Sequence, residues 1–496
     1  MSSLIANTRY GQVRGEQVDN VYVWKGIPYA KPPVGKLRFR PPVQPDKWDG
    51  VRDATTFGKT AMQPNSEMMK FLGDSPQGSS EDCLYLNIWS QGTDDKRRPV
   101  MVWIHGGAFM YGSGSSETYD GTSFAQTGDV VVVTINYRLG AFGFLHLEEI
   151  GGEAFAGSGN CGILDQIAAL KWVQENIGAF GGDPNNVTVF GESAGAMSIG
   201  TLLGTEQAEG LVHKAILQSG AANNVLASNV ATNVTRKILS HLNIQENELE
   251  RLFEIPAEEL VQASEVVPPM SLCPVVDNTV IKKQPLEMLT EGYAKNIPVL
   301  IGTTEDEYRL FTFADLTWRK LDEKGIEELF KRTFRKYWDQ MSEQLAGEPL
   351  TQSLYEKLMT WDMFTYPAIT LAETRVRQSE KVWMYRFDYK STAFGGALQS
   401  CHALELPFVW NTVKNQITTA FVGDAPERIP LAEQMHEAWI AFAKQSNPST
   451  PALPDWPEYE LDSRATMLFN IENTIQHDPA QADRLFWEQI VAVGKR

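Results

Sequence analysis

Cysteine is scarce in this 496-residue sequence, and its cysteines form none of the usual disulfide or metal motifs. The four lie far apart, with no C-x-x-C pair and no Cys/His cluster at zinc spacing: Cys83, Cys161, Cys273 and Cys401. A disulfide scaffold and a structural zinc site are therefore excluded as the basis of the fold. We expect no metal and no cofactor.

Positive charge and long apolar runs are lacking too. The chain has 44 basic and 62 acidic residues, a net charge of −18, which would repel a phosphate backbone and excludes a nucleic-acid partner. No run reaches the roughly 18 apolar residues that would insert into a membrane. The first residues show no basic cap before an apolar stretch, so we expect no secretory signal and a cytoplasmic location.

Repeats, low-complexity tracts and long linkers are absent as well, which predicts one domain over residues 1–496. Short β-branched runs alternate with stretches of helical period, the pattern of a mostly parallel sheet with helices on both faces. Strands are expected at 99–104, 130–136, 187–190, 215–217, 297–301 and 382–389, and helices at 163–177, from 194, and at 431–442. Residues from about 225 to 375 read as a mainly helical insertion over the functional edge of the sheet.

The strongest local motif is Gly-Glu-Ser-Ala-Gly at residues 191–195. It follows a buried strand and opens a helix, the setting of a nucleophile elbow, where a tight turn lifts the serine oxygen above the sheet edge. Glycines on either side leave room where a Cβ would meet neighbouring chain. Ser193 is therefore the candidate nucleophile, and a helix-capping serine in a glycine-rich loop is the alternative.

A serine nucleophile needs a base and an acid that orients the base, in the chain order Ser, acid, His for this architecture. Of the histidines well downstream, His402 suits a sheet edge best, because it follows the strand at 382–389 through a glycine-rich loop. The acid should follow the strand at 297–301. Glu305, Asp306 and Glu307 all do so, and their positions alone do not choose among them.

The oxyanion formed during acyl transfer needs preorganised N–H donors. His-Gly-Gly-Ala at 105–108, directly after the strand at 99–104, is of the type that supplies them. Gly106 and Gly107, with the N–H of Ala194 next to the nucleophile, are the expected donors. His105 itself is more simply explained as structural than as a base.

Several sequence blocks occur along nearly the whole chain in the order that is typical of a known protein family. They include YGQVRG, SEDCLYLNIW, VMVWIHGGAF, NYRLGAFGFL, GILDQIAALKWVQENIGAFGGDPNNVTVFGESAGA, IPVLIGTTEDE and CHALELPFVW. The chain resembles the type-B carboxylesterases of the cholinesterase-like α/β-hydrolase family, close to the bacterial para-nitrobenzyl esterases. The resemblance implies an α/β-hydrolase fold. It also implies a monomeric esterase acting on small-molecule esters.

Family position carries roles onto individual residues. It makes Ser193 the nucleophile, Glu307 the acid and His402 the base, with Gly106, Gly107 and Ala194 as the oxyanion hole. Glu192 and Ser219 occupy positions that in the family surround the catalytic residues without reacting themselves. The resemblance further implies buried ion pairs between Arg38 and Glu81 and between Arg138 and Asp165.

Two positions depart from the family pattern. The partner cysteine of Cys83 in secreted relatives is missing, so Cys83 is expected to be a free thiol. The residue after the acid is usually glycine, whereas Tyr308 follows Glu307 here. The resemblance therefore does not fix the backbone conformation of the loop that carries Glu307.

The leading hypothesis is a serine carboxylesterase that cleaves short-acyl esters of aromatic or bulky alcohols, such as p-nitrobenzyl or p-nitrophenyl esters. Amide or carbamate hydrolysis by the same machinery is one alternative, and a non-catalytic binding module of the same fold is another. The turn-rich segment 62–78 contains Met68, Met69, Phe71 and Leu72. These side chains either pack down on the rim of the site or form an adaptable apolar lip over the substrate.

Overall fold

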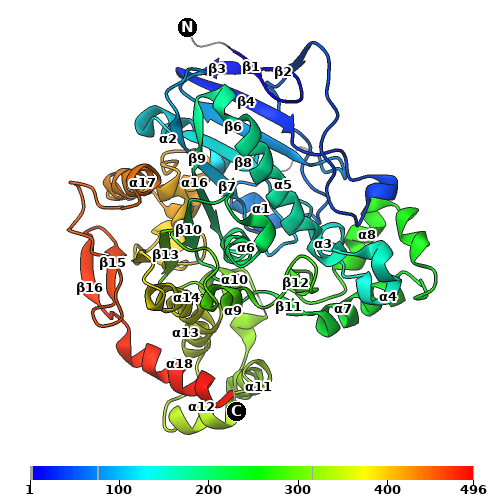
Figure 1. Ribbon diagram of the computed structural model, residues 1–496. Helices are drawn as coiled ribbons and strands as arrows, with labels where there is room; N and C mark the ends of the chain where they lie inside the picture. The colour runs from blue at the N-terminus through cyan, green and yellow to red at the C-terminus, as the bar shows by residue number, and fades with distance from the viewer. Residues whose placement is uncertain (1–3, 75–77, 316, 495–496) are drawn as a thin grey trace.

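The computed structural model describes residues 4–74, 78–315 and 317–494, and in them a large twisted sheet runs through the molecule (Figure 1). Its strand order is β16-β15-β14-β13-β10-β9-β7-β8-β6-β4-β3. The strands are β3 (Glu16–Val18), β4 (Val21–Pro28), β6 (Tyr85–Ser90), β7 (Arg98–Ile104), β8 (Val131–Ile135), β9 (Gly182–Glu192), β10 (Lys214–Gln218), β13 (Val299–Thr304), β14 (Val382–Phe387), β15 (Ala465–Phe469) and β16 (Thr474–His477).

The centre of this sheet is parallel and its edges are antiparallel. Neighbouring strands from β8 through β7, β9, β10, β13 and β14 to β15 pair in parallel. The pairs β3–β4, β4–β6, β6–β8 and β15–β16 are antiparallel. The strands of the centre are buried on both faces, which is why they read as continuous apolar runs in the sequence.

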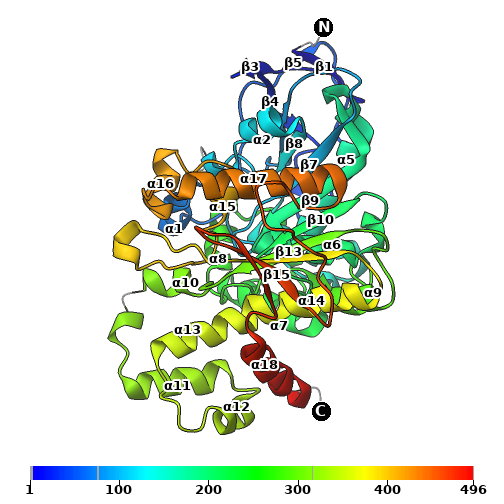
Figure 2. The same ribbon diagram turned by 90° about the vertical axis from the view of Figure 1, so that its left-hand side faces the viewer.

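Helices cover both faces of the sheet, and alternate side chains of each strand point to opposite layers. In β7, Val100, Val102 and Ile104 belong to the core shared with α5 (Cys161–Asn176), α6 (Ala194–Leu203) and α14 (Tyr366–Arg377). Met101 and Trp103 belong to the core shared with α2 (Thr122–Gly128) and α17 (Arg428–Gln445). Figure 2 shows α17 lying across its face of the sheet.

The region from 225 to 375 is mostly helical, although β13 joins the central sheet from within it. Its helices are α7 (Ser228–His241), α8 (Ala257–Ser264), α9 (Pro285–Thr290), α10 (Arg309–Phe313), α11 (Glu323–Thr333), α12 (Trp338–Gln344), α13 (Gln352–Thr360) and α14, with a π turn at Trp361–Thr365. A separate apolar core joins α11, α12 and α13 to α18 (Gln481–Gly494), at the lower end of Figure 1.

The remaining elements are short. They are α1 (Glu67–Phe71), α3 (Gly140–Phe144), α4 (Glu148–Gly151), α15 (Leu406–Val409), α16 (Gln416–Val422), a small sheet of β1 (Ile5–Asn7), β2 (Gln12–Arg14) and β5 (Val51–Asp53), and the pair β11 (Leu226–Ala227) and β12 (Val275–Val276).

The strands and helices expected from the sequence are present, with shifted ends. β9 begins at Gly182, five residues before the expected strand, and α17 begins at Arg428 rather than at residue 431. The edge strand β16, which ends at His477, was not expected from the sequence. It is held by antiparallel pairing with β15, and a short polar segment gives no local sign of such a pairing.

Candidate active site

Ser193 occupies a sharp turn between the end of β9 and the start of α6. Its backbone has φ 53° and ψ −124°, a strained conformation for a residue with a side chain. A Cβ added to Gly191 would lie 2.6 Å from the carbonyl oxygen of Ile104, and one added to Gly195 would lie 2.0 Å from the same atom. Both glycines are therefore required by the close approach of β7 to this turn.

His402 and Glu307 are brought together from two loops that follow neighbouring parallel strands. Nδ1 of His402 lies 2.5 Å from Oε2 of Glu307. The second carboxylate oxygen of Glu307 accepts a hydrogen bond of 2.8 Å from the backbone N–H of Thr304, and Glu307 is fully buried. The carboxylate is thus fixed on both oxygens, and it holds the imidazole in one orientation.

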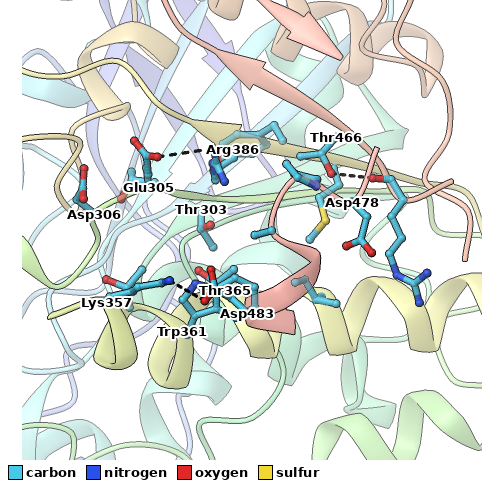
Figure 3. Close-up of a pocket in the computed structure, with 18 of the residues that line it drawn as sticks. Thr303, Glu305, Asp306, Lys357, Trp361, Thr365, Arg386, Thr466, Asp478 and Asp483 are labelled. Atoms are coloured by element: carbon cyan, nitrogen blue, oxygen red, sulfur yellow. Dashed lines mark hydrogen bonds and ion pairs between the residues drawn. The ribbon is translucent and has the colours of Figure 1, made fainter. Parts of the chain in front are cut away.

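The other two acidic candidates have neighbours other than His402. Glu305 and Asp306 both line a cavity of about 380 Å³, where Glu305 lies 3.7 Å from Arg386 (Figure 3). Asp306 accepts a hydrogen bond from the backbone N–H of Ser400. The structure therefore separates three adjacent carboxylates that the sequence leaves equivalent.

Tyr308, in the place where glycine is usual, needs no special backbone. Its φ of −69° and ψ of −13° lie in the right-handed helical region, and its N–H donates to Oγ1 of Thr360 over 3.1 Å. The loop therefore accepts a tyrosine without strain. Its side chain lines the cavity beside Ser193.

Glu192 lies on the opposite side of the imidazole from Glu307. One of its carboxylate oxygens is 3.0 Å from Nε2 of His402, and its side chain is almost completely buried. Burial alone would lower the pKa of His402. The negative charges of Glu192 and Glu307 outweigh that effect and raise the pKa well above its usual value.

The glycine loop after β7 lies beside this turn. Gly107 has φ +105°, and a Cβ there would lie 2.3 Å from the carbonyl oxygen of Tyr111. A Cβ on Gly106 would lie 2.8 Å from the backbone oxygen of Glu192. Ala194 opens α6, so its N–H is one of those that a helix leaves without an intrahelical partner.

His105 has a structural place in this loop. It is buried, its ring stacks on Tyr137 at 4.5 Å between centroids, and its Nδ1 lies 2.8 Å from the carbonyl oxygen of Gly106. Burial lowers its pKa to about 4, so the ring is neutral at physiological pH.

Ser193, His402, Gly106, Gly107 and Glu192 all line one cavity of about 470 Å³. Its walls are largely apolar. Met68, Met69, Phe71 and Leu72 of the segment singled out in the sequence contribute to them, together with Met197, Leu310, Phe311, Met363, Phe364 and Phe421. Phe71 also packs edge-on against Phe421 at 5.5 Å, so the segment both packs on the rim and faces the cavity.

Comparison with known proteins agrees with this geometry. The model of the carboxylesterase family matches residues 2–487. The para-nitrobenzyl esterase of Bacillus subtilis is 42% identical over 98% of each chain, and the human cocaine esterase is 32% identical over 98% of this chain and 91% of the relative. This chain belongs to the carboxylesterase family. It is a serine carboxylesterase, a carboxylic ester hydrolase.

Solved structures of the family confirm the α/β-hydrolase fold of this carboxylesterase. The carboxylesterase EST55 of Geobacillus stearothermophilus superposes with a TM-score of 0.88 at 46% identity, covering 98% of this chain and all of that one. A structure of PNB esterase gives 0.88 at 40% identity, covering 98% and 99%.

The carboxylesterase also contains both expected ion pairs. Nε and Nη2 of Arg38 contact the two carboxylate oxygens of Glu81 at 2.8 and 2.5 Å. Arg138 and Asp165 form a bidentate pair at 2.8 and 2.7 Å, with both side chains buried. Such pairs matter chiefly because removal of one partner leaves an uncompensated buried charge.

Two buried residues near the site, Glu405 and Gln218, were not singled out from the sequence. Glu405 is completely buried and accepts a 3.1 Å hydrogen bond from Gln218, whose own amide oxygen accepts one from Trp439. Burial, with the nearby charges of Glu192 and Glu307, raises the pKa of Glu405 to about 8. Glu405 lies three residues after His402 in the same sequence block, and this proximity could have indicated that it belongs near the site.

Ser219 directly follows the end of β10, the strand that pairs with β9. It is buried with φ 53°, and its N–H donates to the carbonyl oxygen of Gly302 over 2.8 Å. Within the described ranges no group of three or more metal-ligating side chains is placed to hold an ion. None of the described helices is both long and apolar enough to cross a bilayer.

Proposed function

We propose that Ser193 is the nucleophile, His402 the general base and Glu307 the acid that orients it. The observation that supports this assignment best is the 2.5 Å contact between Glu307 and His402, because His402 lines the same cavity as the strained turn at Ser193. Gly106, Gly107 and Ala194 are the proposed oxyanion donors.

In this mechanism Oγ of Ser193 attacks the carbonyl carbon of the ester while Nε2 of His402 takes the hydroxyl proton. The tetrahedral oxyanion accepts hydrogen bonds from the three backbone N–H groups. Collapse breaks the C–O bond, and His402 returns its proton to the leaving alkoxide. Water then attacks the acyl-enzyme by the same route, and Ser193 is regenerated with release of the carboxylic acid.

Glu192 and Ser219 are proposed as positioning residues. The carboxylate of Glu192 is 3.0 Å from Nε2 of His402, so it stabilises the imidazolium form that appears during both transfers. Ser219 anchors the backbone behind the turn through its bond to Gly302.

A fluorophosphonate probe tests the nucleophile. Wild type should be labelled once per chain, and Ser193→Ala should fold and remain unlabelled. Labelling that survives in Ser193→Ala, or folded wild type that is never labelled, would contradict the assignment.

For the substrate we propose esters with a short acyl group and an aromatic or bulky alcohol, such as p-nitrobenzyl or p-nitrophenyl esters. The cavity of about 470 Å³ suits a molecule of that size, and its methionine and phenylalanine walls suit an aromatic group. Among p-nitrophenyl esters from acetate to palmitate, kcat/KM should peak at the short chains. A peak at palmitate would refute this specificity, and faster cleavage of a matched anilide would favour an amidase.

The apolar segment of the cavity wall gives a second test of specificity. Replacing Met68, Met69 and Phe71 together by alanine should change the preference among alcohols more than it changes turnover of p-nitrophenyl acetate. An equal loss on all esters would mean that the segment serves only as scaffold.

We further propose a monomeric, single-domain enzyme of the cytoplasm. The four cysteines are buried and none is bonded to another, which suits a reducing compartment. Titration in denaturant without reductant should find four thiols, and light scattering should give the mass of one chain. Finding two thiols or none would contradict the compartment, and a dimer mass would contradict the monomer.

A further inference from the structure

An aromatic side chain from the loop that carries Glu307 forms part of the wall of the active-site cavity. Tyr308 lines the same cavity as Ser193 and His402, and it is partly exposed. A partly exposed ring in a cavity wall presents its surface to a substrate. The steps of ester hydrolysis give this residue no chemical role, so its contribution must come from the space that it fills.

The Tyr308 ring is packed from behind by the helical core that joins α11, α12, α13 and α18. Tyr355 of α13 meets the ring edge-on, with 5.9 Å between the ring centroids. Tyr355 is itself only 4% exposed, and its hydroxyl is 2.9 Å from Oγ1 of Thr333. The rings of Trp318 and Phe330 pack against it at 5.3 and 5.4 Å. Tyr308 therefore stands between the cavity and a packed core.

Two further contacts hold the Tyr308 ring in this place. Its backbone N–H donates to Oγ1 of Thr360 over 3.1 Å, and Phe311, which also lines the cavity, packs against the ring at 5.4 Å. Burial and the adjacent hydroxyl of Tyr355 raise the pKa of Tyr308 to about 12, so the hydroxyl is uncharged at neutral pH. The side chain acts on a substrate through its shape rather than through charge.

The acyl group is the part of an ester that meets this wall. The alcohol departs first, whereas the acyl group stays bonded to Ser193 until water attacks. An alcohol placed toward the rim, where residues 68–72 lie, leaves without passing the acyl group. The acyl chain then extends toward the interior, which is the side on which the helical core covers Tyr308.

We propose that Tyr308 sets the maximum length of acyl group that the enzyme accepts. The ring ends the acyl part of the cavity, so a short chain fits in front of it and a longer chain must displace it. Displacement would break the packing of the ring against Phe311 and Tyr355. This inference rests on the proposed function, because it names the residue that produces the preference for short acyl groups.

Removal of the ring tests the proposal. Tyr308→Ala should open a space that reaches back to Tyr355. Each methylene group that becomes buried raises kcat/KM roughly fourfold, so two such groups give about 15-fold. The ratio of kcat/KM for p-nitrophenyl hexanoate to that for p-nitrophenyl acetate should therefore rise by about 15-fold over wild type.

Two other substitutions at the same position serve as controls, with circular dichroism as the check on the fold. Tyr308→Phe keeps the ring and should hold the hexanoate-to-acetate ratio within about threefold of wild type. Tyr308→Leu keeps an apolar chain against the helical core and should give a smaller rise, which tests the proposal even if the alanine variant does not fold. An unchanged ratio in the folded smaller variants, or an equal fall of both esters, would overturn the proposal.

Ethyl acetate and hexyl acetate report on the alcohol side. Their kcat/KM ratio should stay within about threefold of wild type in Tyr308→Ala, because the change lies in the acyl part of the cavity. A larger change in this pair than in the hexanoate and acetate pair would overturn the assignment of Tyr308 to the acyl group.

A binding measurement tests the same wall without turnover. In calorimetry, Ser193→Ala with Tyr308→Ala should bind hexananilide relative to acetanilide about 15-fold more tightly than Ser193→Ala alone. An unchanged relative affinity would overturn the proposal. If no ester is hydrolysed and no probe labels Ser193 while this shift in binding is seen, the proposed catalytic function fails and the role of Tyr308 in the cavity stands.

Discussion

Replacement of Glu307 by glutamine should leave the fold intact and remove most of the activity. Both oxygens of the Glu307 side chain accept hydrogen bonds, one from the N–H of Thr304 at 2.8 Å and one from Nδ1 of His402 at 2.5 Å. A carboxamide has a single acceptor oxygen, so its NH₂ must face one of these two donors. It also carries no charge to stabilise the imidazolium.

The size of the effect follows from those two losses. A hydrogen bond to a charged group contributes about 1.5–3 kcal/mol, and a buried donor left unsatisfied costs about 1–3 kcal/mol more. The sum, about 2.5–6 kcal/mol in the transition state, corresponds to a fall in kcat of roughly 10²- to 10⁴-fold. The upper end equals the loss caused by the corresponding change in a Ser-His-Asp triad.

The assay is hydrolysis of p-nitrophenyl acetate, with circular dichroism and thermal unfolding as checks on the fold. Asp306→Asn and Glu305→Gln are the matched controls, because both side chains line the other cavity. Each should retain activity within about threefold, the range of an ordinary surface-type substitution. If Asp306→Asn proved more damaging than Glu307→Gln, the acid would be assigned to the wrong residue.

Three further predictions concern other parts of the molecule. Because the pKa of His402 is raised, kcat/KM should increase with pH, with the midpoint of the rise above pH 6.5. Glu192→Gln removes one nearby negative charge and should therefore shift that midpoint to lower pH. A midpoint that stays where it is in the variant would contradict this reasoning. Gly195→Ala should lower stability by about 3 kcal/mol or more in urea unfolding, whereas Gly178→Ala, with no atom within 4 Å of the new Cβ, should change it little. Arg138→Met should cost about 3–5 kcal/mol in the same assay, since it strands a buried carboxylate, and a loss below about 1 kcal/mol would refute that reasoning.

Much of this enzyme could be predicted from local sequence. The strands of the sheet centre are continuous apolar runs because helices cover both their faces, and β7, β8 and β10 lie within one or two residues of their expected bounds. The nucleophile turn is equally local, because the glycines at 191 and 195 and the strand before them are neighbours in sequence. Family resemblance added the choice of Glu307 and the buried ion pairs.

Only the tertiary structure decided which carboxylates face which cavity. Glu305, Asp306 and Glu307 are chemically alike and adjacent, and the direction of each depends on how the chain leaves β13 against the loop that carries His402, almost a hundred residues later. The ring of Tyr308 is half-buried because α13, about fifty residues further along the chain, packs against it. Burial and electrostatic environment are properties of packed neighbours, and those neighbours are distant in sequence, so no local pattern specifies them.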